Sequence, residues 1–333
     1  MRKLLVLASI TAGGLLFALV LLIVGFDSIV EPFRTFSLLY LSFFLLSSVL
    51  LYIVYVLRWA AVLKYQGIKV PFLLLLRYKL IGSSINYLTP VSRIGGEPVK
   101  AYLFKKKMKT DSALSSIVLE TMLGMFTDVL FVCFLLVFMI IFFALPSEIA
   151  SLSLMLSLIG LALIAVYFST LLNRKGPLSH VIRVVYLLLR KPILKKLIEK
   201  IRIMEEQMTE FLRLRKKGVI QAVAISMISW PLTFLQYKFA LLSIGFEASF
   251  TIIFLSIVAT TIASIMPIPA AFGVQEAGHI SLFSLVATAN IGFALSIFLR
   301  LKDLIITFVG LTLLSHEGLD IIDILRKNNK KIL

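Results

Sequence analysis

Residues 86–100 read Asn86-Tyr-Leu-Thr-Pro90-Val-Ser-Arg93-Ile-Gly95-Gly96-Glu97-Pro-Val-Lys100, and they separate apolar runs that are typical of membrane spans. The stretch combines prolines, two glycines, a carboxylate and two cations, which together do not suit a continuous apolar helix. Irregular backbone is tolerated at membrane depth only where protein or a water-filled cavity surrounds it. We therefore expect this stretch to break a membrane segment and to line a site.

A related pattern occurs late in the chain. Residues 269–276 read Pro269-Ala-Ala-Phe-Gly273-Val-Gln-Glu276, so a proline precedes a glutamate by seven residues in both stretches (97 − 90 and 276 − 269). Two broken segments in corresponding halves of a chain indicate the substrate site of a transporter. The simpler alternative is that both are ordinary Pro/Gly loops.

The composition is that of a membrane protein. Of the 333 residues, 60% are hydrophobic and 15% are charged, and the mean hydropathy is +1.02. These values exclude an ordinary water-soluble globule and predict an all-α polytopic protein with a single membrane domain, residues 1–333. The lone Cys133 excludes a disulfide within the chain. Neither a Walker A pattern nor a set of residues with metal-ligand spacing is present, so we expect no cofactor, no metal and no enzyme activity.

The net charge of +17 follows the loops between the apolar runs. In a soluble protein such a charge would suggest nucleic acid, but here membrane orientation and anionic lipid headgroups explain it better. Lipid is therefore the expected partner, nucleic acid is not, and the oligomeric state is left open.

Apolar runs and loop charges predict six full spans and two re-entrant hairpins. Because cationic loops stay in the cytoplasm, residues 72–109 must enter and leave from the cytoplasmic side, and residues 250–290 from the opposite side. Two opposed hairpins are the signature of an inverted repeat, formed here by residues 1–172 and 218–333. We expect an integral protein of the cytoplasmic membrane with both termini in the cytoplasm. The predicted full spans, the first of them uncleaved, are 4–26, 36–63, 114–145, 149–172, 219–244 and 291–314.

Residues 173–217 are strongly basic and connect the two halves. Beyond Pro192, apolar residues recur at intervals of three and four, which predicts an amphipathic helix. We expect this segment to lie on the cytoplasmic surface, where its basic face binds anionic lipid or a protein partner.

Charged residues interrupt predicted spans, among them Glu120, Asp128, Arg300, Lys302 and Asp303. Intramembrane charges are costly and face a bundle interior or water. Glu120 and Asp128 lie eight residues apart on one predicted helix, and the alternative for Glu120 is a position at the interface. Arg300 and Asp303 share a face of the last span. We expect Arg300 to meet an anionic ligand or a carboxylate such as Glu120 or Asp128; the alternative is an ion pair that only fixes helix packing.

The motifs, in this order, resemble the lysylphosphatidylglycerol synthase transmembrane, or flippase-like, family, which includes the membrane half of multiple peptide resistance factor proteins. They are Asn86 and Pro90 with Gly95-Gly96-Glu97, Pro269 with Gly273-Val-Gln-Glu276, and Arg300 ten residues before Gly310. The sequence departs from the family pattern after Glu120, where Thr-Met-Leu-Gly follows and the aspartate comes only at position 128. The resemblance implies translocation of a lipid between leaflets. The 333 residues contain no appended aminoacyltransferase domain, so lysyl-lipid synthesis is not expected.

The function expected from the sequence is translocation of an anionic or polyprenyl-linked lipid. The alternatives are a non-transporting scaffold for a lipid-modifying or glycosyl-transferring partner and an ion-coupled transporter of small solutes. We expect Arg300 to bind the headgroup and to lack a counter-charge until lipid arrives. Glu97 and Glu276 should hold the breaks by accepting hydrogen bonds from freed backbone N–H groups. The candidate substrate-binding residues are Asn86, Pro90, Arg93, Gly95, Gly96, Glu97, Lys100, Glu120, Asp128, Pro269, Gly273, Glu276, Arg300 and Asp303.

Overall fold

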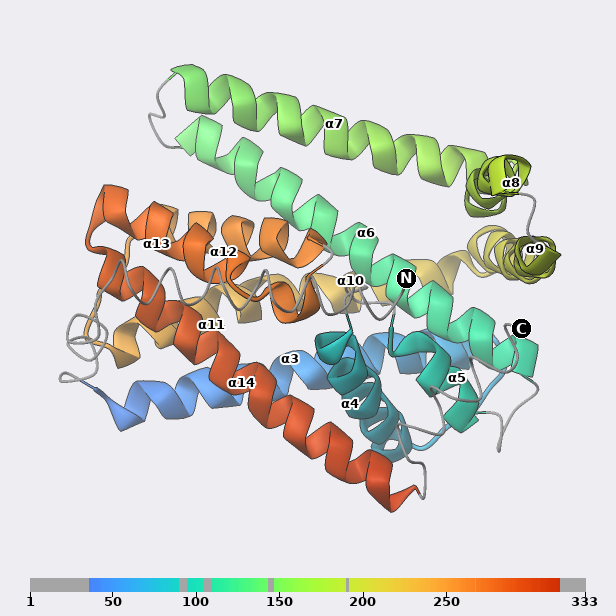
Figure 1. The fold of residues 1–333 in the computed structure, drawn as a ribbon, viewed down its shortest axis with the longest axis horizontal. Coiled ribbons are helices and arrows are strands. Elements are labelled where there is room, and N and C mark those ends of the chain that lie inside the picture. The colour runs from blue at the N-terminus through green and yellow to red at the C-terminus, as the bar shows by residue number, and fades with distance from the viewer. Residues whose placement is uncertain are drawn as a thin grey trace. The chain divides into compact units, whose positions relative to one another are not determined.

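The protein was examined as a computed structural model, which describes residues 36–89, 95–104, 110–142, 147–189, 192–266 and 268–317. The predicted first span, Pro90, Arg93 and the basic tail lie outside these residues. Within them the fold is all-helical, as predicted, and contains no strand (Figure 1). The helices are α3 (Leu38–Tyr65), α4 (Phe72–Leu88), α5 (Glu97–Phe104), α6 (Thr110–Phe142), α7 (Ser147–Leu172), α8 (Pro177–Leu189), α9 (Pro192–Leu214), α10 (Lys216–Met227), α11 (Ser229–Ser243), α12 (Phe250–Ile265), α13 (Val274–Val286) and α14 (Ala289–His316), with a short 3₁₀ helix, η2 (Pro269–Ala271).

In the described parts of the chain, three stretches are long and apolar enough to cross a bilayer: Leu38–Tyr65, Ser115–Phe142 and Lys216–Ser243. Two shorter apolar helices, Ser157–Leu172 and Phe250–Ser264, accompany them. The predicted last span is a single helix, α14. The chain is thus helical and rich in membrane-length apolar segments, while the count of six full spans stays a prediction.

The chain divides into two compact units that interleave along the sequence. The first consists of Met1–Tyr55, Leu76–Val99 and Ile228–Leu313, and the second of Val56–Leu75, Lys100–Met227 and Leu314–Leu333. The units are described separately below.

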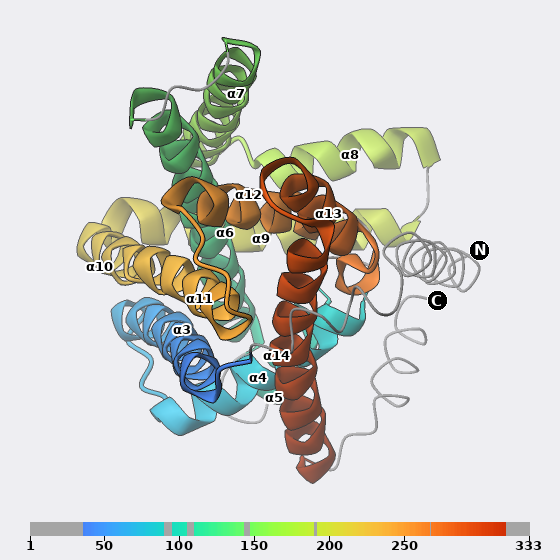
Figure 2. The same ribbon diagram turned by 90° about the vertical axis from the view of Figure 1, so that its left-hand side faces the viewer.

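In the first unit, α12 and α13 run side by side, as both ribbon views show (Figures 1 and 2). Glycines allow α14 to approach its neighbours closely. A Cβ on Gly310 would lie 1.9 Å from the Ser84 hydroxyl oxygen, and one on Gly292 would lie 2.4 Å from the His279 carbonyl oxygen. Ser84 Oγ also donates to the Ile306 carbonyl at 3.2 Å. These contacts hold α4 and α13 against α14.

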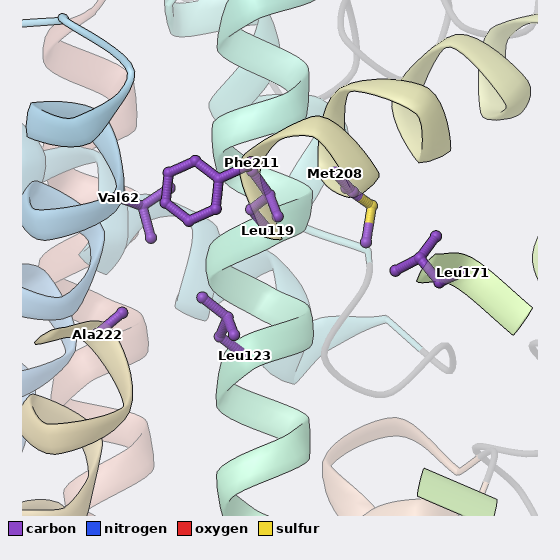
Figure 3. Packing of buried hydrophobic residues seen from close by; sticks show 7 residues of the cluster. All are labelled: Val62, Leu119, Leu123, Leu171, Met208, Phe211 and Ala222. Carbon is purple, nitrogen blue, oxygen red and sulfur yellow. The ribbon is translucent and has the colours of Figure 1, made fainter. Parts of the chain in front are cut away.

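In the second unit, α6 and α7 lie side by side (Figure 1). A buried apolar cluster joins five helices (Figure 3). The predicted amphipathic helix is confirmed as α9, which begins at Pro192. Its apolar residues Met208 and Phe211 are buried in this cluster, so at these positions the stripe packs on the protein's own helices. The sequence did not predict α8 as a separate helix in the same segment. The cluster consists of Val62, Leu119, Leu123, Leu171, Met208, Phe211 and Ala222.

Candidate functional site

The second broken segment is an irregular turn between two short helices of the first unit. After α12 the chain forms η2, and α13 begins only at Val274. Ala270 and Ala271 have φ values of 55° and 49°, and Gly273 has a φ of 81°. A left-handed conformation costs a non-glycine residue about 1–2 kcal/mol. The break is therefore a strained structure that its surroundings must hold in place.

Arg300 of α14 holds this break. Its Nη1 donates to the Ala270 carbonyl at 2.7 Å, and its Nη2 donates to the Ala271 carbonyl at 3.3 Å. Nε donates to Glu276 Oε1, Nη2 donates to Glu276 Oε2 at 2.9 Å, and Nη1 donates to the Tyr87 hydroxyl at 3.2 Å. A guanidinium has five N–H groups, and these five bonds use all of them.

Glu276 pairs with Arg300 and also caps α13. The Gly273 N–H donates to Glu276 Oε2 at 2.8 Å, so the predicted hydrogen bond from a freed backbone N–H is confirmed. The carboxylate lies in the first turn of α13, where the helix dipole favours negative charge. Glu276 is fully buried and Arg300 is 7% exposed. A buried carboxylate and a buried guanidinium are stable here because each satisfies the other.

These contacts correct two expectations about Arg300. The expectation that it lacks a counter-charge is wrong, because it forms a bidentate pair with Glu276. Its expected face-sharing partner, Asp303, pairs with Lys302 instead, with Nζ and Oδ1 3.2 Å apart. The alternative of a structural ion pair was weighed from the sequence, but Glu276 was not among the partners expected for Arg300.

Sequence reasoning missed three residues around this break. Tyr87 accepts from Arg300, and the Phe272 ring lies 4.9 Å from the guanidinium carbon. His279 is fully buried: Nδ1 lies 2.8 Å from the Ser296 hydroxyl oxygen and Nε2 lies 3.0 Å from that of Thr260. A histidine three residues after Glu276 lies on the same face of α13, and this spacing was the available signal for His279.

Asn86 and Gly96, which flank the first break, are joined by a hydrogen bond. The Asn86 side-chain oxygen accepts a hydrogen bond from the Gly96 N–H at 2.6 Å. This bond joins the end of α4 to the residue before α5. A Cβ on Gly96 would lie 2.0 Å from the Gly82 carbonyl oxygen, and one on Gly95 would lie 2.0 Å from the Thr89 hydroxyl oxygen. Both positions therefore require glycine. Glu97 occupies the first turn of α5 and is buried, while its predicted hydrogen bond to freed N–H groups stays a prediction.

A second buried ion-pair cluster lies in the second unit. Arg58 Nη2 donates to Glu120 Oε1 at 2.6 Å, and Arg58 Nη1 donates to the Ser226 hydroxyl at 3.4 Å. Lys100 Nζ lies 3.9 Å from Glu120 Oε2 and 5.3 Å from the centre of the Trp59 ring. Glu120 is fully buried, so its carboxylate does not reach toward water, as the interfacial alternative for it would require. We call Arg58, Lys100 and Glu120 the Glu120 cluster.

Arg58 belongs to a predicted apolar span, and its charge was overlooked. The rule that singled out Arg300 applied equally to Arg58, since intramembrane cations seek a partner. Gly124 makes room for it, because a Cβ there would lie 2.6 Å from Arg58 Nη2. The second predicted carboxylate of this helix, Asp128, is only half-buried.

The structure thus groups the candidate residues into three sets. Pro269 starts η2, and Gly273, Glu276 and Arg300 meet at the second break. Asn86 and Gly96 meet at the first break. Lys100 and Glu120 meet in the Glu120 cluster.

Both breaks lie inside a region that matches one family model. The model of the lysylphosphatidylglycerol synthase TM region matches residues 6–313. The chain belongs to this family. The lysylphosphatidylglycerol synthase TM match covers both breaks and the Glu120 cluster, which confirms the resemblance drawn from the motifs.

Two relatives align with most of this chain. A UPF0104 membrane protein of Pyrococcus horikoshii is 28% identical over 312 residues, which cover 87% of this chain and 88% of the relative. A UPF0104 membrane protein of Methanothermobacter thermautotrophicus is 25% identical over 284 residues, which cover 83% of this chain and 84% of that relative. No solved structure matches the chain significantly. Membership of the lysylphosphatidylglycerol synthase TM family makes the chain an integral membrane protein of a lipid-related family.

Proposed function

We propose that this protein moves an anionic or polyprenyl-linked lipid between the leaflets of the cytoplasmic membrane, without catalysing a reaction. The observation that carries the proposal is the second break, where two left-handed alanines are held by the buried Arg300–Glu276 pair. Backbone strain of this kind concentrates at functional sites. Broken helices near the middle of a bilayer are typical of transporters. Membership of a lipid-related family favours a lipid as the substrate.

Helix lengths support the architecture of six full spans with two re-entrant hairpins. At 1.5 Å per residue, α12 with 16 residues and α13 with 13 residues extend about 24 Å and 20 Å, less than the roughly 30 Å of hydrocarbon. They also lie side by side, as the two arms of a hairpin do (Figure 1). In the first hairpin, α4 has 17 residues and α5 has 8. We propose that these two hairpins enter from opposite faces in the halves 1–172 and 218–333.

Cysteine labelling tests this topology. The single native cysteine, Cys133, is 5% exposed, so its labelling background should be low. A cysteine replacing Lys106 should react with a membrane-impermeant maleimide only from the cytoplasmic side, because it lies in a basic loop. A cysteine replacing the exposed Glu247 should react only from the opposite side. Labelling of both from the same side in intact cells and inverted vesicles would refute the inverted repeat.

The five hydrogen bonds of Arg300 constrain how a lipid headgroup could contact the second break. Since all five guanidinium N–H groups already have acceptors, a lipid phosphate must displace Glu276, Tyr87 or a backbone carbonyl to contact Arg300. Separating a bidentate charged pair in a buried site is costly. We propose that Arg300 acts first as a positioning residue that fixes the shape of the break.

Translocation is tested directly in proteoliposomes. The purified protein is reconstituted with fluorescent phosphatidylglycerol, and a membrane-impermeant reductant bleaches the outer leaflet. In vesicles that contain protein, we expect the reductant to remove more than half of the fluorescence, because lipid from the inner leaflet reaches the outer one. In vesicles without protein, only the outer half should be lost. A matched preparation of protein-free vesicles sets the background. Equal bleaching in both preparations, with protein incorporation verified, would reject translocation and leave the scaffold function as the alternative.

A further inference from the structure

Two cavities of the second unit meet at one point. The first is a groove of about 770 Å³ between α6 and α7, and the second is a pocket of about 1020 Å³ formed by α8, α9 and the turn before α8. Lys175 and His180 line both of them. An apolar groove beside a charged pocket has the two-part chemistry of an amphipathic ligand.

The walls of the groove are apolar. On α6 the lining residues follow the spacing i, i+3, i+4, i+7, which is one helix face about two turns, or roughly 10 Å, long, and on α7 they lie between Gly160 and Thr170. The α6 wall is formed by Met122, Met125, Phe126 and Val129, and the α7 wall includes Leu163, Val166, Tyr167 and Thr170.

Contacts between α6 and α7 lie at both ends of the groove. Toward the charged pocket, the Tyr167 hydroxyl donates to Met122 Sδ at 2.9 Å. At the other end, a Cβ on Gly160 would lie 3.0 Å from Cys133 Sγ, so the two helices are in close contact there. The whole α6 wall, Met122 to Val129, lies within Ser115–Phe142, one of the stretches able to cross a bilayer. The groove therefore extends from the turn before α8 into the apolar part of the protein.

The charged pocket depends on a tight turn. Arg174 and Gly176 have φ values of 58° and 53° on either side of Lys175. A Cβ on Gly176 would lie 2.4 Å from Ser179 Oγ and 2.7 Å from Glu205 Oε2, so only glycine fits. The turn places Lys175 where the groove and the pocket meet.

The pocket lining carries a small positive excess. Four cations and three carboxylates give a net charge of +1 with His180 neutral (4 − 3). Arg202 pairs with Glu206 at 3.1 Å, and the Ser179 N–H donates to Glu205 at 3.2 Å. No carboxylate of a described residue forms an ion pair with Lys175. The cations are Arg174, Lys175, Arg183 and Arg202, and the carboxylates are Glu205, Glu206 and Glu210.

We propose that this cavity pair binds one phospholipid, with an acyl chain in the α6–α7 groove and the phosphate beside Lys175 and His180. A single phosphodiester matches the excess of one positive charge. An acyl chain suits the groove better than a peptide, because a peptide would bring backbone N–H and C=O groups to a depth where nothing satisfies them. The proposal goes beyond translocation, since a lipid can bind here whether or not it crosses the bilayer.

Binding of a short-chain lipid tests the site. The dissociation constant of dioctanoyl phosphatidylglycerol is measured by native mass spectrometry on the full chain in detergent. We expect one tightly bound molecule. Lys175→Gln should weaken binding about fivefold, the effect of one cation near a phosphate. Leu163→Trp should weaken it about tenfold by displacing about two buried methylene groups.

Matched controls come from the same helices. Leu161→Trp changes an exposed α7 leucine that does not line the groove, and Lys217→Gln changes an exposed lysine outside the pocket. Both should bind the lipid within about twofold of the parent, as surface substitutions do. If Leu163→Trp lowers the melting temperature, Val129→Trp on the opposite wall takes its place.

Three results would overturn the proposal. These are unchanged affinity in Lys175→Gln, equally tight binding of dioctanoylglycerol, which lacks the phosphate, and equally tight binding of inorganic phosphate, which lacks the chains. If the parent protein binds the lipid but does not translocate it, the proposed function is wrong and this binding site still stands.

Discussion

Arg300→Ala is expected to lower the free energy of unfolding by about 3–5 kcal/mol, the cost of leaving one partner of a buried ion pair alone. Glu276 is fully buried and would lose the guanidinium that neutralises it. The carbonyls of Ala270 and Ala271 would lose their donors at the same time. An Arg300 without a counter-charge, as expected from the sequence, could be removed with little loss of stability, and its observed pair with Glu276 reverses that expectation. Denaturation in mixed micelles, followed by helical circular dichroism, measures the change.

A double substitution separates the ion pair from the other contacts of Arg300. Arg300→Met combined with Glu276→Leu removes both charges, so the double variant should be more stable than the sum of the two single changes predicts. Lys302→Gln is the control on the same helix, because its pair with Asp303 is partly exposed and should be worth about 1 kcal/mol or less. Strictly additive single effects would show that Arg300 and Glu276 do not act as a pair.

Glu120→Ala is expected to destabilise the protein by a similar amount, about 3–5 kcal/mol. The substitution removes the carboxylate shared by two buried cations, Arg58 and Lys100. Glu120→Gln should be less harmful, because the amide keeps an acceptor oxygen near Arg58. The same denaturation experiment measures both variants.

An exposed ion pair of the same unit provides the control for Glu120. Arg202 and Glu206 are 74% and 60% exposed and lie one helical turn apart. Glu206→Ala should therefore change stability by at most about 0.5 kcal/mol. If Glu120→Ala and Glu206→Ala were equally mild, the buried cluster would not contribute to the stability of the fold.

The sequence predicted that certain charged residues are buried, but it did not predict their partners. Glu120 and Arg300 were recognised because charges in apolar spans require a partner. Their partners were not, since Arg58 lies 62 positions before Glu120 and Tyr87 lies 213 positions before Arg300. Such pairings depend on how helices pack, which periodicity within one helix does not reveal.

The irregular backbone was predicted only in part. Proline and glycine indicated both breaks, and the Glu276 cap followed from the need to satisfy freed N–H groups. The left-handed conformation of Ala270 and Ala271 had no sequence signal, because alanine favours the right-handed helix. It is the contacts of Arg300, outside the local sequence, that hold these residues there.

The side-chain contacts of His279 and the Arg300–Glu276 pair determine which helices of the first unit can move separately. The imidazole contacts Thr260 of α12 and Ser296 of α14, and the Arg300–Glu276 pair joins α13 to α14. Sliding α13 along α14 would break both the His279–Ser296 contact and the Arg300–Glu276 pair. A displacement that carries α12, α13 and α14 along as one rigid body would break none of them. Any hinge used in such a displacement therefore lies outside residues 260–300.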